Sequence, residues 1–266
     1  MKRLLALLGL AALIAVPAAA ATHNSSPPVM QKGKLIVAFG DPAPGFVNGH
    51  VRGTSFTHPR GYEVDIAKNL AKSLHLTPVW KYSPWTGLFN PGTKKFDISF
   101  QEATITSQRK KTVDFTSPYM NANQGVLVSK TAQVPHSVAE LKELQTCAQD
   151  GTTGLDYIDT VLHPTKTPLT YPTTTAAYQS VANGTCEAFI LDVPLVALEK
   201  KAHSSRYGSV AGQIVTHEQY GAVLQKDSHL TMVVDAKIRK LTRNGTIAKL
   251  QKKWFNVNFN AMPKLK

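Results

Sequence analysis

The most informative part of the chain reads Phe96-Asp-Ile-Ser-Phe-Gln-Glu-Ala-Thr-Ile-Thr-Ser-Gln-Arg109-Lys-Lys-Thr-Val-Asp-Phe-Thr-Ser-Pro-Tyr119. Its pattern predicts a buried strand at 96–100, a polar turn, an Arg on a short helical segment and a second short strand. In open α/β sheets, ligands bind outside the carboxyl ends of strands. Arg109 follows such a turn, and a guanidinium group can hold a carboxylate through two parallel hydrogen bonds. The stretch therefore predicts a site for a small molecule that carries an anionic group.

The segments before this stretch predict an α/β fold. Residues 34–39 and 77–82 have the composition of buried strands. Between them, residues 62–75 place their apolar side chains on one face of a helix. Strands that alternate with helices favour a mainly parallel sheet with crossover helices. A Gly- and Pro-rich loop at 40–53 is expected to border a cleft.

After Tyr119 the pattern begins again, which predicts a second lobe. A strand at 124–129 carries the chain into it, and a buried strand at 188–192 ends in an acid, Asp192. Residues 220–224 then return the chain to the first lobe. We expect lobe 1 to comprise 30–123 and 222–266, and lobe 2 to comprise 124–221. Two lobes joined by a hinge around a central cleft suit closure on a ligand.

The N-terminus has the features of an export signal. Lys2 and Arg3 precede a short apolar run and a small-residue segment, so we predict a signal peptide at 1–21, cleaved near Ala20–Thr22. The alternative, a permanent anchor, is disfavoured because a spanning helix needs about 20 apolar residues. The first cysteine is Cys147, which argues against a lipid anchor. We expect a soluble protein in the periplasm.

The charge balance raises the question of nucleic-acid binding. The chain of 266 residues has a net charge of +13, or +11 without the two basic residues of the signal. These charges are scattered and no nucleic-acid motif accompanies them, so a basic solvated surface is the simpler reading. The nine His show no paired metal-ligand spacing. We predict no metal, no cofactor and no nucleic-acid partner.

Two cysteines, Cys147 and Cys186, are the only ones in the chain. In an oxidising compartment such a pair favours a disulfide. Two free buried thiols are the alternative. No redox motif or zinc site is indicated.

An ordered set of motifs resembles a known family. It comprises Lys34-Leu-Ile-Val-Ala, Gly61-Tyr-Glu-Val-Asp-Ile-Ala, Ala103-Thr-Ile-Thr-Ser-Gln-Arg109, Val113-Asp-Phe-Thr-Ser-Pro-Tyr119, Gly151-Thr-Thr, Gly184-Thr-Cys-Glu-Ala and Lys253-Trp-Phe255. The chain resembles the periplasmic polar amino-acid-binding proteins of ABC importers, the extracellular solute-binding proteins of family 3. The resemblance covers about 32–255 and implies a type II periplasmic-binding fold.

The resemblance also implies roles for individual residues. Arg109 would pair with the ligand α-carboxylate, and Thr104 beside it would donate to the same group. Thr152 and Thr153 would close on the carboxylate from the second lobe. Asp192 would receive the α-ammonium group.

Further contacts are implied around the ligand side chain. Trp85 lies where the family often has an aromatic residue over that side chain, although most aromatics belong to the core. Phe46 and Asp41 fall in the loop after the first strand, another habitual contact. Glu102 replaces a small residue, and its carboxylate would reach the ligand ammonium, a cationic ligand side chain, or Arg109 itself.

The chemistry of an amino acid ligand supports Arg109 and Asp192 independently of the family resemblance. A zwitterion needs a cation and an anion on opposite walls of one cleft, and each is costly to bury unless it is paired. Arg109 and Asp192 meet that need. The bland alternatives are a surface ion pair of Arg109 with Asp114 or Glu102, and capping of the next turn by Asp192.

The expected function is therefore a binding protein that passes an amino acid or related carboxylate to an inner-membrane ABC permease. We expect a monomer with no catalytic residues. The chief rival is a periplasmic enzyme resembling cyclohexadienyl dehydratase, with Glu102 as general acid. A sensor that signals through a membrane receptor is a further alternative.

Overall fold

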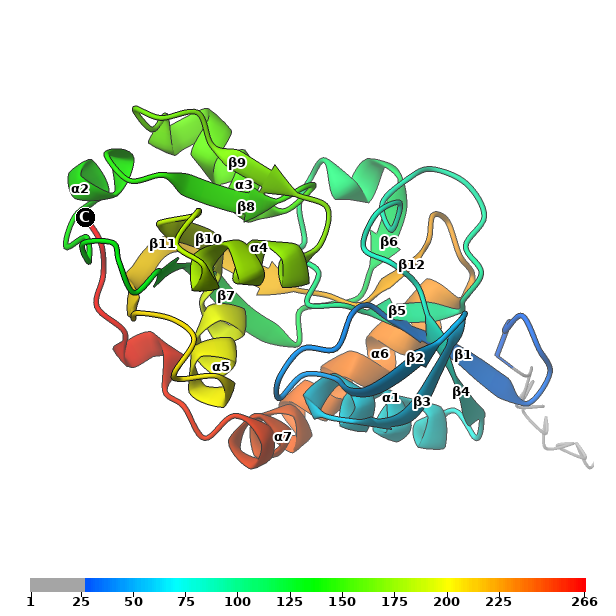
Figure 1. The fold of residues 1–266 in the computed structure, drawn as a ribbon. Helices are drawn as coiled ribbons and strands as arrows, with labels where there is room; N and C mark the ends of the chain where they lie inside the picture. The colour runs from blue at the N-terminus through cyan, green and yellow to red at the C-terminus, as the bar shows by residue number, and fades with distance from the viewer. Residues whose placement is uncertain (1–26) are drawn as a thin grey trace, which may run out of the picture.

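The protein folds into two α/β lobes (Figure 1). The computed structural model describes residues 27–266, so the predicted signal peptide and cleavage site lie outside the described residues. One lobe contains a seven-stranded sheet and the other a five-stranded sheet. The two-lobed α/β architecture predicted from the sequence is confirmed.

The first sheet is centred on parallel strands. β1 (Lys34–Phe39) lies between β4 (Thr77–Tyr82) and β5 (Ile98–Phe100). Its full order is β2-β3-β4-β1-β5-β12-β6. The other strands are antiparallel to their neighbours: β2 (Asn48–Arg52), β3 (Ser55–Arg60), β6 (Val113–Phe115) and β12 (Val223–Gln225). β1 is an apolar run because a central parallel strand is covered on both faces.

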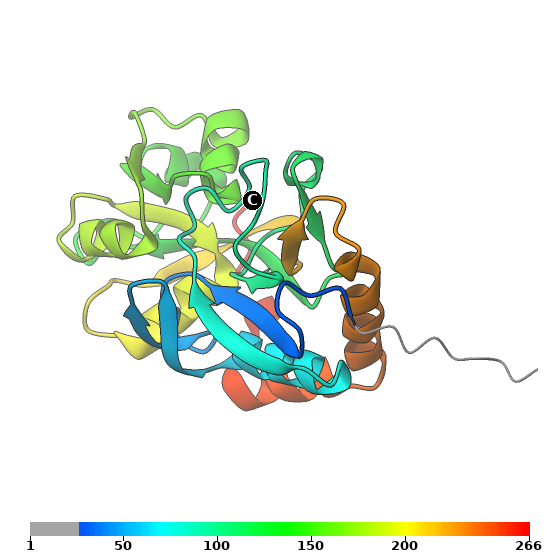
Figure 2. The ribbon, with the colours of Figure 1, turned by 90° about the vertical axis from the view of Figure 1, so that its right-hand side faces the viewer.

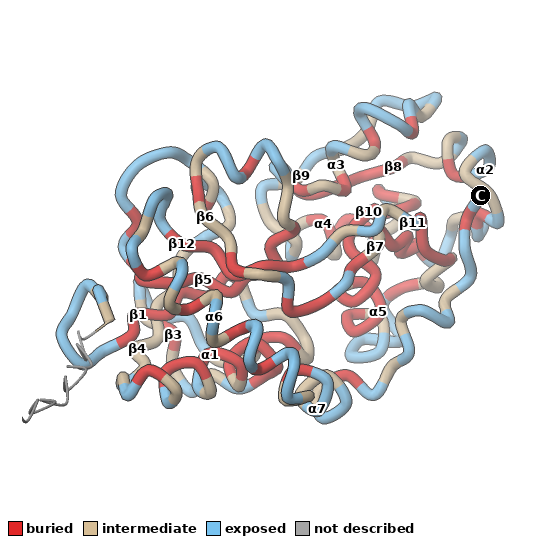
Figure 3. The backbone as a smooth tube through the Cα atoms, turned by 180° about the vertical axis from the view of Figure 1, so that it is seen from behind, coloured by how far each residue is buried: buried red, intermediate tan, exposed pale blue. Residues whose placement is uncertain are grey.

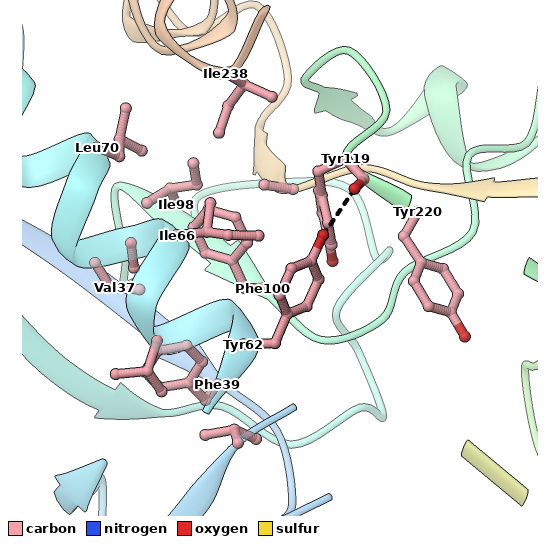
Figure 4. Close-up of a cluster of buried hydrophobic side chains, with 14 of the residues drawn as sticks. Val37, Phe39, Tyr62, Ile66, Leu70, Ile98, Phe100, Tyr119, Tyr220 and Ile238 are labelled. Carbon is pink, nitrogen blue, oxygen red and sulfur yellow. Dashed lines mark hydrogen bonds between the residues drawn. The ribbon is translucent and has the colours of Figure 1, made fainter. Parts of the chain in front are cut away.

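Three helices pack together on one side of this sheet: α1 (Tyr62–Ser73), α6 (Leu230–Arg243) and α7 (Thr246–Trp254). Figure 4 shows side chains of α1, β1 and β5 meeting in the core, with the Tyr62 hydroxyl donating to the Tyr119 carbonyl over 2.8 Å. α1 begins directly after Gly61, which has a φ of 146°. A Cβ there would lie 2.0 Å from the Phe46 carbonyl oxygen. Only glycine fits this close approach.

The second sheet has the order β11-β7-β10-β8-β9. Its strands are β7 (Met120–Val128), β8 (Thr146–Gln149), β9 (Leu169–Tyr171), β10 (Ala188–Asp192) and β11 (Val210–Tyr220). Its helices are α2 (Val138–Lys142), α3 (Thr153–Tyr157), continued by a π-helical turn (Ile158–Leu162), α4 (Thr174–Ala182) and α5 (Val193–Ala202). α2 and α3 pack on one face, and α4 and α5 on the other. Within this lobe β8 and β10 are buried along their whole length and β7 along most of it (Figure 3).

A disulfide joins Cys147 on β8 to Cys186, which precedes β10, with the Cα atoms 5.9 Å apart. It links segments separated by 39 residues in the sequence. The predicted disulfide is therefore present.

The chain crosses between the lobes on two adjacent segments. The first leads into β7, and the second leaves β11 for β12. β7 and β11 are antiparallel, with a register shift between Ile214 and Glu218. At the crossing the Tyr119 amide donates to the Tyr220 carbonyl over 3.0 Å. Figure 2 shows the lobes from the side.

Two local expectations differ from the structure. The expected loop at 40–53 contains β2, which forms a hairpin with β3 because residues 48–60 pair across the turn. The C-terminal residues, assigned to the first lobe, instead lie along the second (Figure 1): the Val138 amide donates to the Lys266 carbonyl over 3.0 Å, and Leu265 joins the core beside α2. Apolar burial of Leu265 accounts for this position.

None of the helices in the described part of the chain is long and apolar enough to span a bilayer.

Candidate functional site

A cavity of about 360 Å³ lies between the lobes and is lined by residues of both. The structure brings eight of the nine predicted contact residues to its wall: Asp41, Trp85, Glu102, Thr104, Arg109, Thr152, Thr153 and Asp192. They come from the loops that follow β1, β4, β5 and β8 and from the end of β10. The carboxyl ends of strands thus gather the candidate site, as expected for open α/β sheets.

Phe46 is the exception. Its side chain is fully buried in the core of the first lobe and does not line the cleft. Its ring packs 4.8 Å from that of Phe255 and 6.0 Å from that of Tyr62, measured between centroids. The prediction of a ligand contact was wrong because these aromatic neighbours offer Phe46 a better apolar environment.

Arg109 links the two lobes. Nη1 donates to the Thr104 carbonyl of lobe 1 over 2.8 Å, and Nη2 to the Gly151 carbonyl of lobe 2 over 2.9 Å. Its Cζ lies 4.2 Å from the ring centroid of Phe89 and 5.2 Å from that of Trp85. Burial lowers the pKa of Arg109 to about 10, opposed by nearby carboxylates, chiefly that of Asp192. The group therefore stays charged at neutral pH.

The turn after β8 presents Thr152 and Thr153 to the cleft. Thr152 is the N-cap of α3, where its hydroxyl accepts from the Leu155 amide over 3.3 Å. Within α3, a Cβ on Gly154 would lie 2.5 Å from the Ile190 carbonyl oxygen. The glycine thus lets the helix pack directly against β10.

Asp192 ends β10 on the cleft wall. Its carboxylate accepts from Gln124 Nε2 over 2.6 Å and from the Tyr220 hydroxyl over 2.8 Å. Burial raises its pKa to about 7, helped by the Glu218 charge and opposed by these two hydrogen bonds and Arg109. Its side chain does not cap α5, so the alternative of a simple capping residue does not describe it.

Glu102 lies in the cleft beside a second acid, Glu63. The Glu102 amide donates to Glu63 Oε1 over 3.0 Å, and the Tyr119 hydroxyl donates to the same oxygen. Glu102 Oε1 and Glu63 Oε2 have no hydrogen-bond partner among the described residues. Burial raises the pKa of Glu63 to about 7 and holds that of Glu102 well above its usual range, with the Glu63 charge next in importance. A proton on Glu102 would allow its carboxyl group to donate to Glu63.

Sequence reasoning missed Glu218, on β11 at the crossing between lobes. Its Oε2 accepts from the hydroxyls of Thr153 (2.6 Å) and Thr104 (3.1 Å), which belong to different lobes. Gln124 Nε2 donates to the same carboxylate over 3.1 Å and also bonds Asp192. No periodic signal marks Glu218, because its partners lie far away in the sequence.

Phe89 was also missed, although its ring is the one nearest to the Arg109 guanidinium. The spacing of four residues between Trp85 and Phe89 was the one sequence feature that could have indicated that both rings lie near the same group. Among residues 27–266, no group of His, Cys, Asp or Glu is arranged to hold a metal ion.

Comparison with known proteins assigns the family. Residues 51–257 match the profile of the bacterial extracellular solute-binding proteins, family 3. The chain belongs to this family. Among its relatives is the L-cystine-binding protein TcyJ of Escherichia coli, 27% identical over 201 residues, which are 74% of this chain and 75% of the relative.

Solved structures of amino-acid-binding proteins share the fold. An ancestral arginine-binding protein bound to glutamine matches with a TM-score of 0.74 at 26% identity, over 85% of this chain and 100% of that one. An ancestral amino acid-binding protein described as a precursor of cyclohexadienyl dehydratase matches with a TM-score of 0.71 at 31% identity, over 84% and 95%. The fold is therefore that of a two-lobed amino-acid-binding protein.

Proposed function

We propose that this protein captures an amino acid between its lobes and delivers it to an ABC importer. One observation carries the proposal: the cleft pairs a buried cation, Arg109, with a buried acid, Asp192, 6% exposed, from the other lobe. A free amino acid carries one anion and one cation, so it complements both groups. The family and the amino acid ligands named for its relatives support the same class of ligand.

Binding would use Arg109 for the α-carboxylate. A guanidinium group has five N–H donors, and the bonds to Thr104 and Gly151 occupy two of them. The aromatic rings of Phe89 and Trp85 hold the group in place. The oriented guanidinium group therefore presents N–H donors to the cleft. A hydrogen bond from these donors to a ligand carboxylate would be stronger than one between neutral groups.

The ligand ammonium group would lie among acids. Asp192 and Glu102 both line the cavity, and burial raises the pKa of both. A bound cation would favour their ionised forms. This excess of carboxyl groups over Arg109 favours ligands that carry positive charge in addition to the α-ammonium group.

Calorimetric titration of ligand-stripped mature protein with the twenty amino acids tests the proposal. We expect one-to-one binding of at least one amino acid and recovery of the ligand unchanged. Arg109→Ala should remove binding, and Arg109→Lys should weaken it at least tenfold because an ammonium group cannot bond a carboxylate bidentately.

The matched control is Arg239→Ala. Arg239 is half exposed on α6 and pairs with Asp235, away from the cavity. This variant should bind like the parent protein. Undiminished affinity in folded Arg109→Ala, checked by circular dichroism, would contradict the site assignment.

A second candidate function is a carboxylate-binding dehydratase. It is favoured by the raised pKa of Glu102, an acid that lines the same cavity as Arg109, and by likeness to the dehydratase precursor. Incubation with prephenate, followed by its ultraviolet spectrum, tests this candidate. Consumption of prephenate that is lost in Glu102→Gln would favour catalysis over transport.

Export belongs to the same proposal. We expect the mature chain to begin near Ala20–Thr22 and to meet its permease outside the cytoplasmic membrane. N-terminal sequencing of protein from the periplasmic fraction tests the cleavage site.

A further inference from the structure

The cleft extends beyond the residues that one amino acid group would use. Tyr178, Glu199, His203 and Arg206 of the second lobe also line the cavity of about 360 Å³. Cavities of about 300–1,000 Å³ bury drug-sized ligands, which are larger than a small amino acid. The extension leaves room for a second polar group on the ligand.

The two ends of the cleft lie toward opposite faces of the second sheet. α3 packs in the cluster that contains Val126, whereas α4 and α5 pack in the cluster that contains Leu127. Neighbouring strand residues point to opposite faces, so these helices cover different sides (Figure 1). Arg109 bonds Gly151, just before α3, over 2.9 Å, and Arg206 follows α5. The cleft therefore passes across the edge of the sheet, with an arginine toward each side.

The far end is a connected charged set. The carboxylate of Glu199, 6% exposed, accepts from the Tyr207 hydroxyl over 2.6 Å and lies 2.9 Å from His203 Nδ1. Arg206 Cζ lies 5.6 Å from the centroid of the Tyr207 ring. Glu199 and the exposed Arg206 thus both contact Tyr207, which places an anion and a cation on the same part of the cavity wall.

Tyr178 lines the same cavity as both charged sets. Arg109, Glu102 and Asp192 belong to one set, and Glu199 and Arg206 to the other. A ligand with two carboxylates and two ammonium groups would complement both sets.

We propose that the cleft binds a ligand with an amino acid group at each end of a short linker. One group lies against Arg109 and Asp192, and the other against Arg206 and Glu199. The inference rests on the proposed function, since the first group uses the site described above. It adds the ligand class and the far recognition set.

Calorimetry with matched probes tests the inference. The double-ended probes are L-cystine and meso-2,6-diaminopimelate, and the single-ended probe is S-methyl-L-cysteine. We expect a double-ended probe to bind at least tenfold more tightly than S-methyl-L-cysteine. Arg206→Ala should weaken the double-ended ligand about 10- to 100-fold, the range for a lost charged hydrogen bond, and leave S-methyl-L-cysteine unchanged. Arg239→Ala removes the same charge from α6 and should change neither.

Three outcomes would overturn the inference. The first is binding of single amino acids without binding of either double-ended probe. The second is an Arg206→Ala variant with unchanged affinity for the double-ended ligand, and the third is an equal loss for both kinds of probe. Failure of every amino acid to bind the parent protein would overturn the proposed function as well, so the two failures are distinguishable.

Discussion

Single residues in the cleft show how burial prepares ionisable groups for a charged ligand. Arg109 keeps its charge because nearby carboxylates, chiefly that of Asp192, oppose the effect of burial, which lowers its pKa to about 10. Asp192 and Glu63, by contrast, have pKa values raised to about 7, with burial as the largest cause. Asp192 and Glu63 therefore titrate near neutral pH, while Arg109 does not.

Ligand affinity should depend on pH. An ammonium ligand needs ionised acids, so we expect the affinity to increase from pH 5 to pH 8 and binding near pH 7 to release protons. Calorimetry in two buffers of different ionisation enthalpy measures the proton release. Asp192→Asn should weaken binding and reduce the pH dependence; an unchanged pH profile in a variant that still binds would contradict the assignment.

The stability of the ligand-free protein should change in the opposite direction. The folded-state pKa values of Asp192 and Glu63, about 7, exceed the ordinary values of 3.8 and 4.5. Between these limits the folded state binds more protons than the unfolded state, so the contribution of these groups falls as pH rises from about 4 to 7. Thermal unfolding of Asp192→Asn and the parent from pH 5 to pH 8 measures this contribution. The parent should lose more stability than the variant over that range.

At the level of elements, the strand β11 does more than connect the lobes. Glu218 on this strand holds hydroxyls from both lobes and the amide of Gln124, which bonds Asp192. A register shift beside Glu218 accompanies this arrangement. The second crossing therefore helps to position both walls of the cleft.

Glu218→Ala should weaken ligand binding about tenfold, because hydrogen bonds to a charged group contribute about 1.5–3 kcal/mol each. Loss of the Glu218 charge should also lower the pKa of Asp192, which that charge raises. The pH midpoint of binding should then move to lower pH. Gln219→Ala, whose side chain bonds Asn121 at the exposed surface, is the control. A loss of affinity without a shift of the midpoint would indicate a purely structural role.

The disulfide joins β8 to the segment before β10. These two strands end at Gln149 and Asp192, which line the cavity. Closing a loop of this length is expected to stabilise the protein by about 4 kcal/mol, or roughly 8–16 °C in Tm. Reduction, or replacement of both cysteines by Ala, should lower the Tm by that amount in calorimetry. A shift below about 2 °C would show that the link adds little stability.

In the whole molecule, the lobes meet through polar contacts and through a small apolar contact. Leu198 of α5 packs in the core cluster of the first lobe, whereas most buried apolar residues of the second lobe form clusters of their own. Arg109 and Glu218 each bond residues of both lobes. Interfaces of this kind permit relative movement of lobes. Closure would bury the ligand and satisfy the acids beside it.

A ligand that binds only the folded protein should raise its stability by about 2.7 kcal/mol at a concentration of 100 times Kd. For a protein of this size the Tm should increase by roughly 5–11 °C. Thermal unfolding with increasing ligand measures the effect. Arg109→Ala should show no increase at the same concentration.

Local pattern was sufficient for the two-lobed fold, for Asp192 at the end of a buried strand, and for Arg109 on a short helical segment after a polar turn. These features depend on hydrophobic periodicity and on residues that are neighbours in the sequence, so a single segment contains the information that predicts them. Export and cleavage stay predictions, because they concern residues outside the described part of the chain.

Packing between distant segments settled the rest. Phe46 became a core residue because Phe255 and Tyr62 surround it, and the C-terminal residues joined the second lobe through Leu265. Glu218 meets Thr104 across 114 residues of sequence, and Glu102 meets Glu63 across 39. Such contacts, and the pKa shifts that follow from them, depend on three-dimensional burial, and no local periodicity encodes them.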